Sequence, residues 1–167
     1  SFIQLLKQKP ISKITVKEIC DTADINRATF YAHYTDQYDL LHRIEQELIG
    51  GVNQYLKGHD LNVISEAPVE MLEKILNYIK GNAELFLLLL NSRGDIRFRQ
   101  EVTEIIGQQH FSSMNADKEI SGYIFLFFAN GAIGVILKWL EDGMKKPARE
   151  MAELIFKLSM NGRVSFE

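Results

Sequence analysis

The sequence predicts an all-α protein, in which a small N-terminal three-helix unit precedes a larger C-terminal helical bundle. Apolar residues make up 46% of the 167 residues, which is enough for a sizeable buried core. They recur at the i, i+3, i+4 spacing of amphipathic helices along most of the chain. The three prolines lie between these periodic segments rather than inside them, at Pro10, Pro68 and Pro147.

The N-terminal unit is predicted over residues 1–50. The chain begins inside an apolar-periodic segment, 1–9, which we expect to be a first helix truncated at its start, with a basic arm preceding it. Thr15 is a good N-cap for the next helix, and Glu18, three residues later, completes a capping box. This second helix has a single apolar face, made of Val16, Ile19, Cys20 and Ala23.

A tight turn and a further short helix follow. The turn leads to Asn26, which can cap a helix over 27–34. A longer helix, capped by Thr35 or Asp36, then runs to about residue 57. The inward-facing residues of the short helix and its turn are expected to be Ile25, Phe30 and Tyr34.

The C-terminal bundle is predicted over residues 51–167. Helical periodicity there predicts five helices, over 69–80, 83–91, 96–114, 117–144 and 147–160. The helix over 83–91 is apolar on nearly all faces, so we expect it to be buried. The helix over 117–144 is the longest apolar segment, and its wide apolar face also needs a partner.

The short helix over 27–34 presents an outward row of residues suited to DNA. Arg27 and Tyr31 lie one turn apart near its start. An arginine can bind O6 and N7 of guanine through two hydrogen bonds, and Ala28 and Tyr31 can contact a thymine methyl group or a phosphate. Thr29 and His33 can reach phosphate oxygens. An ordinary solvated helix face is the alternative for the same residues.

The order of residues in TVKEICDTADINRATFYAHYTDQYDLL, residues 15–41, resembles the DNA-binding region of the TetR family of transcriptional regulators. This resemblance implies that Thr15, Tyr31 and His33 contact phosphates. It also implies that Lys17, Arg27 and Ala28 face base edges or nearby backbone. The predicted DNA-binding surface is Thr15, Lys17, Asn26, Arg27, Ala28, Thr29, Tyr31, His33, Tyr34 and Gln37.

Three positions depart from the family's pattern. Asp24 occupies the place of the usual turn glycine, and can adopt left-handed geometry at some cost. Cys20 replaces a small alanine, and we expect it to be a core residue rather than a redox switch. Gln37 replaces a lysine that grips a phosphate, so we expect weaker DNA affinity with an unchanged docking mode.

The run FFANGAIGVILKWLEDGMKKPAREMAELI, residues 127–155, resembles the C-terminal domain of a Gram-positive branch of TetR-type regulators. The resemblance implies that the last two helices pair with their two-fold mates in a four-helix bundle, as in a homodimer. Internal packing of Gly131 and Gly134 is the alternative. The predicted dimer interface consists of Ile124, Phe127, Gly131, Gly134, Leu154 and Leu158.

Regulators of this family usually hold a small-molecule effector inside the C-terminal bundle. The residues predicted to bind it here are Tyr78, Phe86, Phe98, Phe111, Tyr123 and Phe127. Polar specificity would come from Tyr78, Tyr123, Asn91 and Arg93. Aromatic residues at helical spacing also form plain core, and that alternative stays open.

Enzymatic function finds no support in the sequence. His33, His42, His59 and His110 show no metal-ligand spacing, and neither a G-x-S-x-G elbow nor a Walker-type loop is present. We therefore expect no enzyme activity, metal or cofactor. The single cysteine, Cys20, fits a reducing compartment. No stretch of about 18 residues is apolar throughout, and no signal peptide precedes the fold, so we expect a soluble cytoplasmic protein with no membrane partner.

Together these observations predict a ligand-responsive TetR-like repressor that binds a palindromic double-stranded DNA operator as a homodimer. The alternative is a TetR-fold coactivator or protein-interaction module that acts through a protein partner and has little DNA affinity of its own. Gln37 motivates this alternative, as does the net charge of residues 1–50, where six lysines and arginines face seven aspartates and glutamates, leaving −1. DNA-binding domains usually gain affinity from positive charge.

Overall fold

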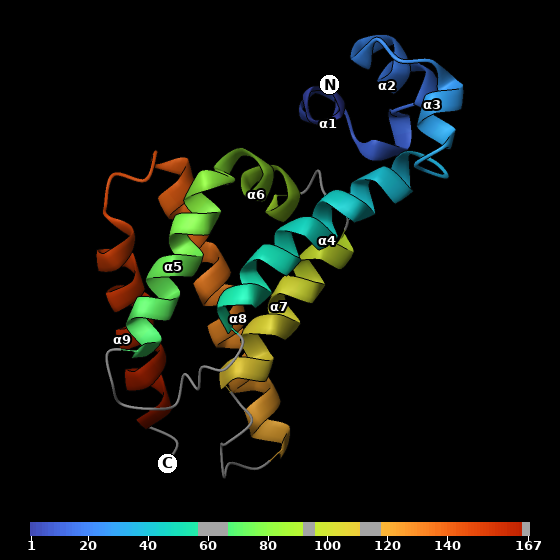
Figure 1. Ribbon diagram of the computed structural model, residues 1–167. Helices are drawn as coiled ribbons and strands as arrows, with labels where there is room; N and C mark the ends of the chain where they lie inside the picture. Colours follow the sequence, from blue (N-terminus) through green and yellow to red (C-terminus); the bar gives the residue numbers. More distant parts are fainter. Residues whose placement is uncertain (57–66, 92–95, 111–117, 165–167) are drawn as a thin grey trace.

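All elements in the described part of the chain, residues 1–56, 67–91, 96–110 and 118–164 of a computed structural model, are helical. The all-α prediction is confirmed. Figure 1 shows a group of short N-terminal helices at one end of the long helix α4 (Gln37–Leu56), and a bundle around its other end. The short helices are α1 (Phe2–Gln8), the 3-10 helix η1 (Ile11–Lys13), α2 (Val16–Ala23) and α3 (Arg27–Tyr31). The bundle adds α5 (Ala67–Gly81), α6 (Ala83–Leu90), α7 (Ile96–His110), α8 (Lys118–Glu141) and α9 (Ala148–Val164).

The N-terminal unit has an apolar core of its own. One side chain from nearly every element is almost completely buried there, and these are Leu6, Ile14, Ile19, Phe30 and Leu41. Cys20 is also buried and has a free thiol, which agrees with its predicted role as a core residue. Burial of each of these aliphatic and aromatic side chains contributes about 1.5–3 kcal/mol to holding the short helices together.

The helix α3 is shorter than predicted. It ends at Tyr31 instead of residue 34, because the N–H groups of His33 and Tyr34 both bond to the carbonyl of Phe30 as the chain turns. Asp36 then caps α4, with Oδ1 accepting from the N–H groups of Tyr38 at 2.8 Å and Asp39 at 2.9 Å.

Ile25 also differs from its prediction. Its side chain is 40% exposed, because it lies in the turn before the α3 cap and outside the apolar face of the helix. Phe30 and Tyr34 do face inward, with ring centroids 5.4 Å apart.

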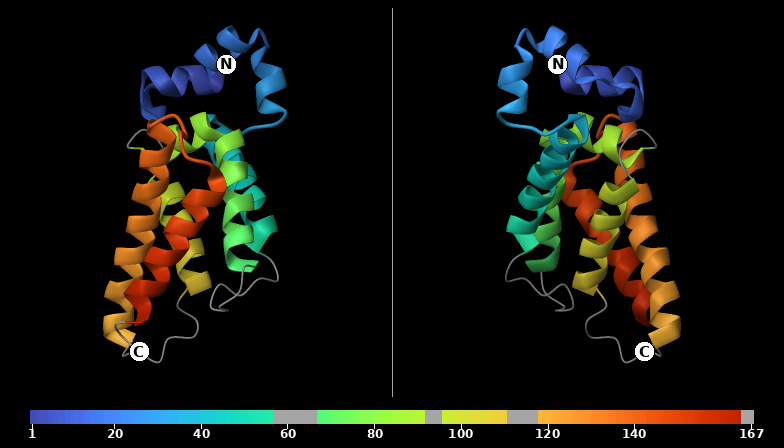
Figure 2. Two further views of the ribbon diagram at one scale, coloured as in Figure 1. Left: turned by 90° about the vertical axis from the view of Figure 1, so that its left-hand side faces the viewer. Right: turned by 90° about the vertical axis from the view of Figure 1, so that its right-hand side faces the viewer.

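The two parts of the molecule are joined in two ways. The helix α4 is continuous from Gln37 to Leu56, so it runs through residue 50, where the sequence suggested a domain boundary. An ion pair between Lys7 of α1 and Glu84 of α6 also links the N-terminal unit to the bundle. Figure 2 shows the same arrangement from two sides, with the N-terminal unit above α6 and the α8–α9 connection.

The connection between α8 and α9 is a tightly bonded turn. Trp139 Nε1 donates a hydrogen bond to the carbonyl of Lys146 at 2.8 Å, which ties the end of α8 to the start of α9. Gly143 and Met144 both adopt positive φ, 74° and 55°, and Met144 N–H bonds back to the Trp139 carbonyl. This turn ends α8 at Glu141 rather than at residue 144 as predicted.

One helix corrects the expectation that no segment is long and apolar enough to span a membrane. Residues Ile120–Glu141 of α8 meet that requirement by length and composition alone, and only 17% of the apolar window is buried within the protein. Most of the apolar surface of α8 is therefore exposed to solvent in the single chain.

Candidate nucleic-acid interface and ligand cavity

Five of the predicted DNA-binding residues line one open groove in the N-terminal unit. They are Thr15, Lys17, Arg27, Tyr31 and Gln37. The groove is completed by Ser12, Ile14 and Val16, so it is formed by η1, α2, α3 and the start of α4. Sequence reasoning missed Ser12, and no motif marks it beyond its place just before the Thr15 cap.

The caps of α2 and α3 position this groove. The Thr15 hydroxyl accepts from Glu18 N–H at 3.2 Å, and Glu18 Oε2 accepts from Thr15 N–H at 3.0 Å, which is the predicted capping box. Asn26 Oδ1 accepts from Thr29 N–H at 2.8 Å, as its predicted cap role requires. Between the two helices, Asp24 takes the left-handed conformation with φ 55° and ψ 46°, as expected at the family's glycine position.

Among the described contacts, some charged side chains of the N-terminal unit form ion pairs, and others are exposed without one. Lys9 Nζ lies 2.5 Å from Glu18 Oε1, and this hydrogen bond is the largest of the effects that lower the pKa of Glu18 from 4.5 to about 2. Among the described residues no ion pair involves Lys13, Lys17 or Arg27, and all three are exposed. These cations are available to an anionic partner such as DNA phosphate.

The end of α3 is held against α4 by Tyr34. Its ring packs on Phe30, and the Arg43 guanidinium lies 5.2 Å from its centroid. Asp39 binds Arg43 Nε at 3.4 Å and accepts from Thr35 N–H at 2.9 Å, and the latter bond is the main cause of the lowered pKa of Asp39. Tyr34 is half-buried, and its described contacts serve packing.

The remaining predicted DNA-binding residues lie outside the groove. Their side chains are exposed on α3 and the turns beside it, and they are Asn26, Ala28, Thr29 and His33. The Thr29 hydroxyl bonds to Asn26 Oδ1 at 3.1 Å, so its proton is used within the cap.

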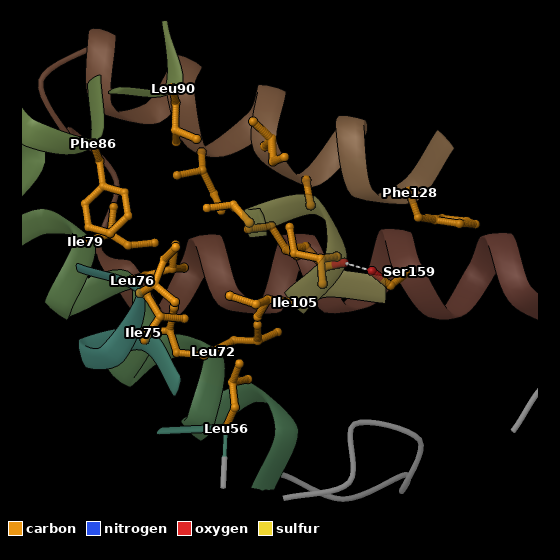
Figure 3. Close-up of a pocket in the computed structure, with 18 residues that line it drawn as sticks. Leu56, Leu72, Ile75, Leu76, Ile79, Phe86, Leu90, Ile105, Phe128 and Ser159 are labelled. Atoms are coloured by element: carbon orange, nitrogen blue, oxygen red, sulfur yellow. Dashed lines mark hydrogen bonds between the residues drawn. The ribbon is translucent and has the colours of Figure 1, made fainter. Parts of the chain in front are cut away.

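The bundle encloses a cavity of about 110 Å³ between α4, α5, α6, α7, α8 and α9. Figure 3 shows its lining, which is apolar apart from one serine. The lining residues are Ile49, Val52, Leu56, Leu72, Ile75, Leu76, Ile79, Phe86, Leu90, Val102, Ile105, Ile106, Phe128, Ala132, Ile133, Ile136, Ile155 and Ser159.

Of the predicted ligand-binding residues that the structure describes, only Phe86 lines this cavity. Phe98 is fully buried, and the centroid of its ring lies 6.2 Å from that of Phe86. The Tyr78 ring packs against α4 instead of lining the cavity. The structure does not support the predicted ligand-binding role of Tyr123 and Phe127, because their side chains are 68% and 76% exposed on the outside of α8.

Of the other residues considered for the ligand site, Asn91 is exposed at the end of α6. Phe111 and Arg93 lie outside the described residues. The aliphatic lining escaped the sequence prediction because aliphatic side chains carry no mark that separates a cavity wall from ordinary core.

The outer face of α8 and α9 is apolar, and no part of the chain that the structure describes covers it. Its large exposed side chains are Ile120, Tyr123, Leu126 and Phe127 on α8 and Leu154 and Leu158 on α9. Gly131 and Gly134 are exposed on α8, and a Cβ added at either would meet no atom within 4 Å. This open space does not support the alternative of internal packing at these glycines. Ile124 is only 7% exposed and faces the bundle, which corrects its assignment to the predicted interface.

Comparison with known proteins agrees with both parts of the chain. The family described as "Bacterial regulatory proteins, tetR family" matches residues 3–44. The family described as "Transcriptional regulator C-terminal region", whose model carries the TetR designation, matches residues 66–161. The chain is 19% identical over 164 residues to the uncharacterized HTH-type transcriptional regulator YxbF of Bacillus subtilis (strain 168). That match covers 95% of this chain but 42% of YxbF, so the chain spans less than half the length of this relative.

Two solved structures share the fold. The dihydroxyacetone kinase operon activator DhaS is similar with a TM-score of 0.60 and 19% identity, covering 99% of this chain and 93% of that one. The fatty acid degradation regulator FadR from Bacillus halodurans is similar with a TM-score of 0.61 and 12% identity, covering 96% and 91%. The two family matches, one over the helix-turn-helix and one over the bundle, establish that this chain belongs to the TetR family of DNA-binding transcriptional regulators.

Proposed function

We propose that the protein is a ligand-responsive repressor that binds a palindromic operator as a homodimer in the cytoplasm. Residues 1–50 would form the DNA-reading unit, and residues 51–167 the regulatory and dimerisation unit. The observation that carries the proposal is the groove that brings Thr15, Lys17 and Arg27 together with Tyr31 and Gln37.

The groove suits a helix-turn-helix docked in the major groove. Arg27, at the first position of α3, can reach a guanine edge, while Tyr31, 56% exposed, lies one turn further along the same helix. Lys17 and Thr15, at the start of α2, can contact the phosphates that flank this edge. A protein bound to an operator excludes other proteins from that DNA, so repression requires no additional protein-binding surface.

Dimerisation is supported by the apolar face of α8 and α9. Exposed aromatic side chains such as Phe127 are costly in water, and the open glycines allow a second helix to approach closely. A two-fold pair of these faces would give two reading units and hence a palindromic site, with half-sites about 34 Å or more apart.

The ligand response is supported by the position of the cavity. Ile49, Val52 and Leu56 line it from α4, and α4 also carries the DNA-reading unit at its other end. A ligand that binds better when α4 is displaced would change the separation of the two reading units and weaken operator binding.

The test is selection of bound sequences from a random duplex library, combined with light-scattering mass. We expect a dimer that enriches one palindrome. Arg27→Ala should lose roughly 5- to 150-fold in operator affinity for each half-site, the range for a lost base contact, and Tyr31→Ala should also weaken operator binding. Gln4→Ala, an exposed change on α1 outside the groove, is the matched control. Unchanged affinity in both groove variants would remove the assigned role of α3, and a monomeric mass would remove the dimer.

A second candidate is a coactivator that works through a protein partner. Likeness in fold to DhaS, named an operon activator, motivates it together with Gln37 and the slight negative charge of residues 1–50. A dimer that enriches no sequence, shows no salt-dependent DNA binding and co-purifies with one partner in fixed stoichiometry would favour this candidate.

A further inference from the structure

The chemistry of the bundle cavity restricts what can occupy it. Among its lining residues in the described part of the chain there is no aspartate, glutamate, lysine, arginine or histidine. Burying a charged group without a partner costs several kcal/mol or more, so a charged ligand head cannot be accommodated there. The lining instead offers isoleucine, leucine and valine side chains, which match a flexible aliphatic chain.

Ser159 on α9 supplies a polar group in this lining. Its hydroxyl donates a hydrogen bond to the Ile155 carbonyl at 2.9 Å, shown as a dashed line in Figure 3. With its proton used, the oxygen still has a lone pair that can accept. In this conformation Ser159 therefore favours a ligand group that donates, such as an alcohol O–H, over a ketone or ester oxygen.

The placement of Ser159 gives the ligand an orientation. In Figure 3 Ser159 and Phe128 lie at one side of the lining, and Phe86 and Ile79 lie at the opposite side. A chain with its polar end at Ser159 would extend its apolar end along the aliphatic lining toward Phe86.

We propose that the cavity binds an uncharged aliphatic alcohol, whose hydroxyl donates to Ser159 and whose alkyl chain fills the aliphatic lining. The inference rests on the proposed function, in which a ligand occupies the bundle. The volume of about 110 Å³ is somewhat below the roughly 150 Å³ of an engineered apolar cavity that holds benzene. The natural probes are therefore short primary alcohols.

The test measures binding of 1-butanol, 1-pentanol and 1-hexanol to the full chain by calorimetry and thermal shift. Affinity should rise about fourfold for each added methylene, as expected for alkyl burial, until the cavity is full. At equal chain length 2-hexanone should bind roughly 2- to 12-fold more weakly than 1-hexanol, because it cannot donate to Ser159. Hexanoate at neutral pH should give no binding.

Two variants locate the site. Ser159→Ala should equalise 1-hexanol and 2-hexanone, and Ala132→Phe should fill the cavity and abolish binding, with folding checked by circular dichroism and mass. Hexanoate binding as tightly as 1-hexanol would overturn the proposal. So would an alcohol preference that survives Ser159→Ala.

Alcohol binding and the selection from the duplex library, measured on the same protein, separate this inference from the proposed function. A protein that binds its operator but none of the alcohols refutes the ligand chemistry and leaves the regulator intact. A protein that binds alcohols with the expected pattern but enriches no DNA sequence supports the ligand chemistry and refutes the DNA-reading role.

Discussion

At the scale of single residues, the N-terminal unit depends on short polar contacts that hold its DNA-facing side chains in place. Glu18 is central, because its carboxylate accepts from Thr15 N–H and the Thr15 hydroxyl and also binds Lys9. These contacts fix the start of α2, where Thr15 and Lys17 enter the groove. A loss at Glu18 should therefore affect both stability and DNA binding.

Thr15→Ala removes the side-chain half of the capping box. The free energy of unfolding should fall by about 0.5–2 kcal/mol, the usual cost of a lost N-cap, measured by urea denaturation at neutral pH. Thr22→Ala is a control, because the Thr22 hydroxyl bonds only to the Glu18 carbonyl within the helix in the described contacts. Equal stability of Thr15→Ala and the wild type would show that the cap contributes nothing.

The same cap predicts a pH dependence. The pKa of Glu18 is lowered from 4.5 to about 2, chiefly by Lys9, so its ionised form stabilises the fold above about pH 4.5. This contribution should be lost as the pH falls toward 2. The difference in unfolding free energy between wild type and Glu18→Gln should then shrink over that interval and stay constant above pH 5. A difference that persists at pH 2 would contradict the assignment.

Lys17→Gln tests the phosphate contact. Removing one phosphate contact per subunit should lower the slope of log K against log salt concentration by about 1 for each subunit, or about 2 for a dimer. The loss in affinity should be similar for all sequences, since phosphates carry no sequence information. Lys157→Gln on α9 is the charge-matched control, and an unchanged slope in Lys17→Gln would place this lysine off the DNA.

At the scale of elements, α4 and α5 pack closely at Gly51. Among the described glycines, it is the one at which an added Cβ would meet another side chain. The Tyr78 ring lies over Gly51, where an added Cβ would be 2.1 Å from Cζ. The ring is held by Tyr55 and Phe86, with centroids 6.2 and 6.3 Å away. Burial raises the pKa of the Tyr78 phenol above its usual value. Tyr78 therefore packs between α5 and α4 at Gly51, outside the described lining of the cavity.

Gly51→Ala should force these helices apart and cost about 1–3 kcal/mol in unfolding free energy, as overpacked cores do. Gly50→Ala is the matched control, because a Cβ there meets nothing within 4 Å and alanine favours a helix by about 0.5–1 kcal/mol. Combining Gly51→Ala with Tyr78→Leu should cost less than the sum of the two single changes. If the losses of unfolding free energy from the two changes were strictly additive, the contact between the added Cβ and Tyr78 would not be the cause of the destabilisation.

At the scale of the whole molecule, the main feature is the apolar face of α8 and α9, which is exposed to solvent in a single chain. Phe127 is 76% exposed at its centre, between Tyr123 and the open glycines. The same helix is long and apolar enough to resemble a membrane span, and the proposed two-fold pairing would account for that composition without a membrane.

Phe127→Lys should place two like charges at the interface and give a mass near the 19.2 kDa of one chain, where the wild type gives about twice that value. The thermal midpoint of the wild type should rise with protein concentration, and that of the variant should not. Gln54→Lys, an exposed change on α4, is the control. A dimeric Phe127→Lys protein would move the interface away from this face.

The sequence by itself determined the features that depend on neighbours along the chain. The Thr15–Glu18 capping box, the Asn26 cap and the left-handed Asp24 were all predictable, because each involves residues within four positions. Helical periodicity likewise predicted an all-α fold, and the order of residues in 15–41 indicated the TetR family.

Only the tertiary structure decided which apolar residues face one another. The helix α8 is apolar on most sides, so periodicity could not tell that Ile124 turns inward while Phe127 turns outward. The cavity gathers side chains from six helices, and no local pattern records that Phe86 and Ser159 face the same space. Such choices are set by packing between distant segments, which have no short-range signature.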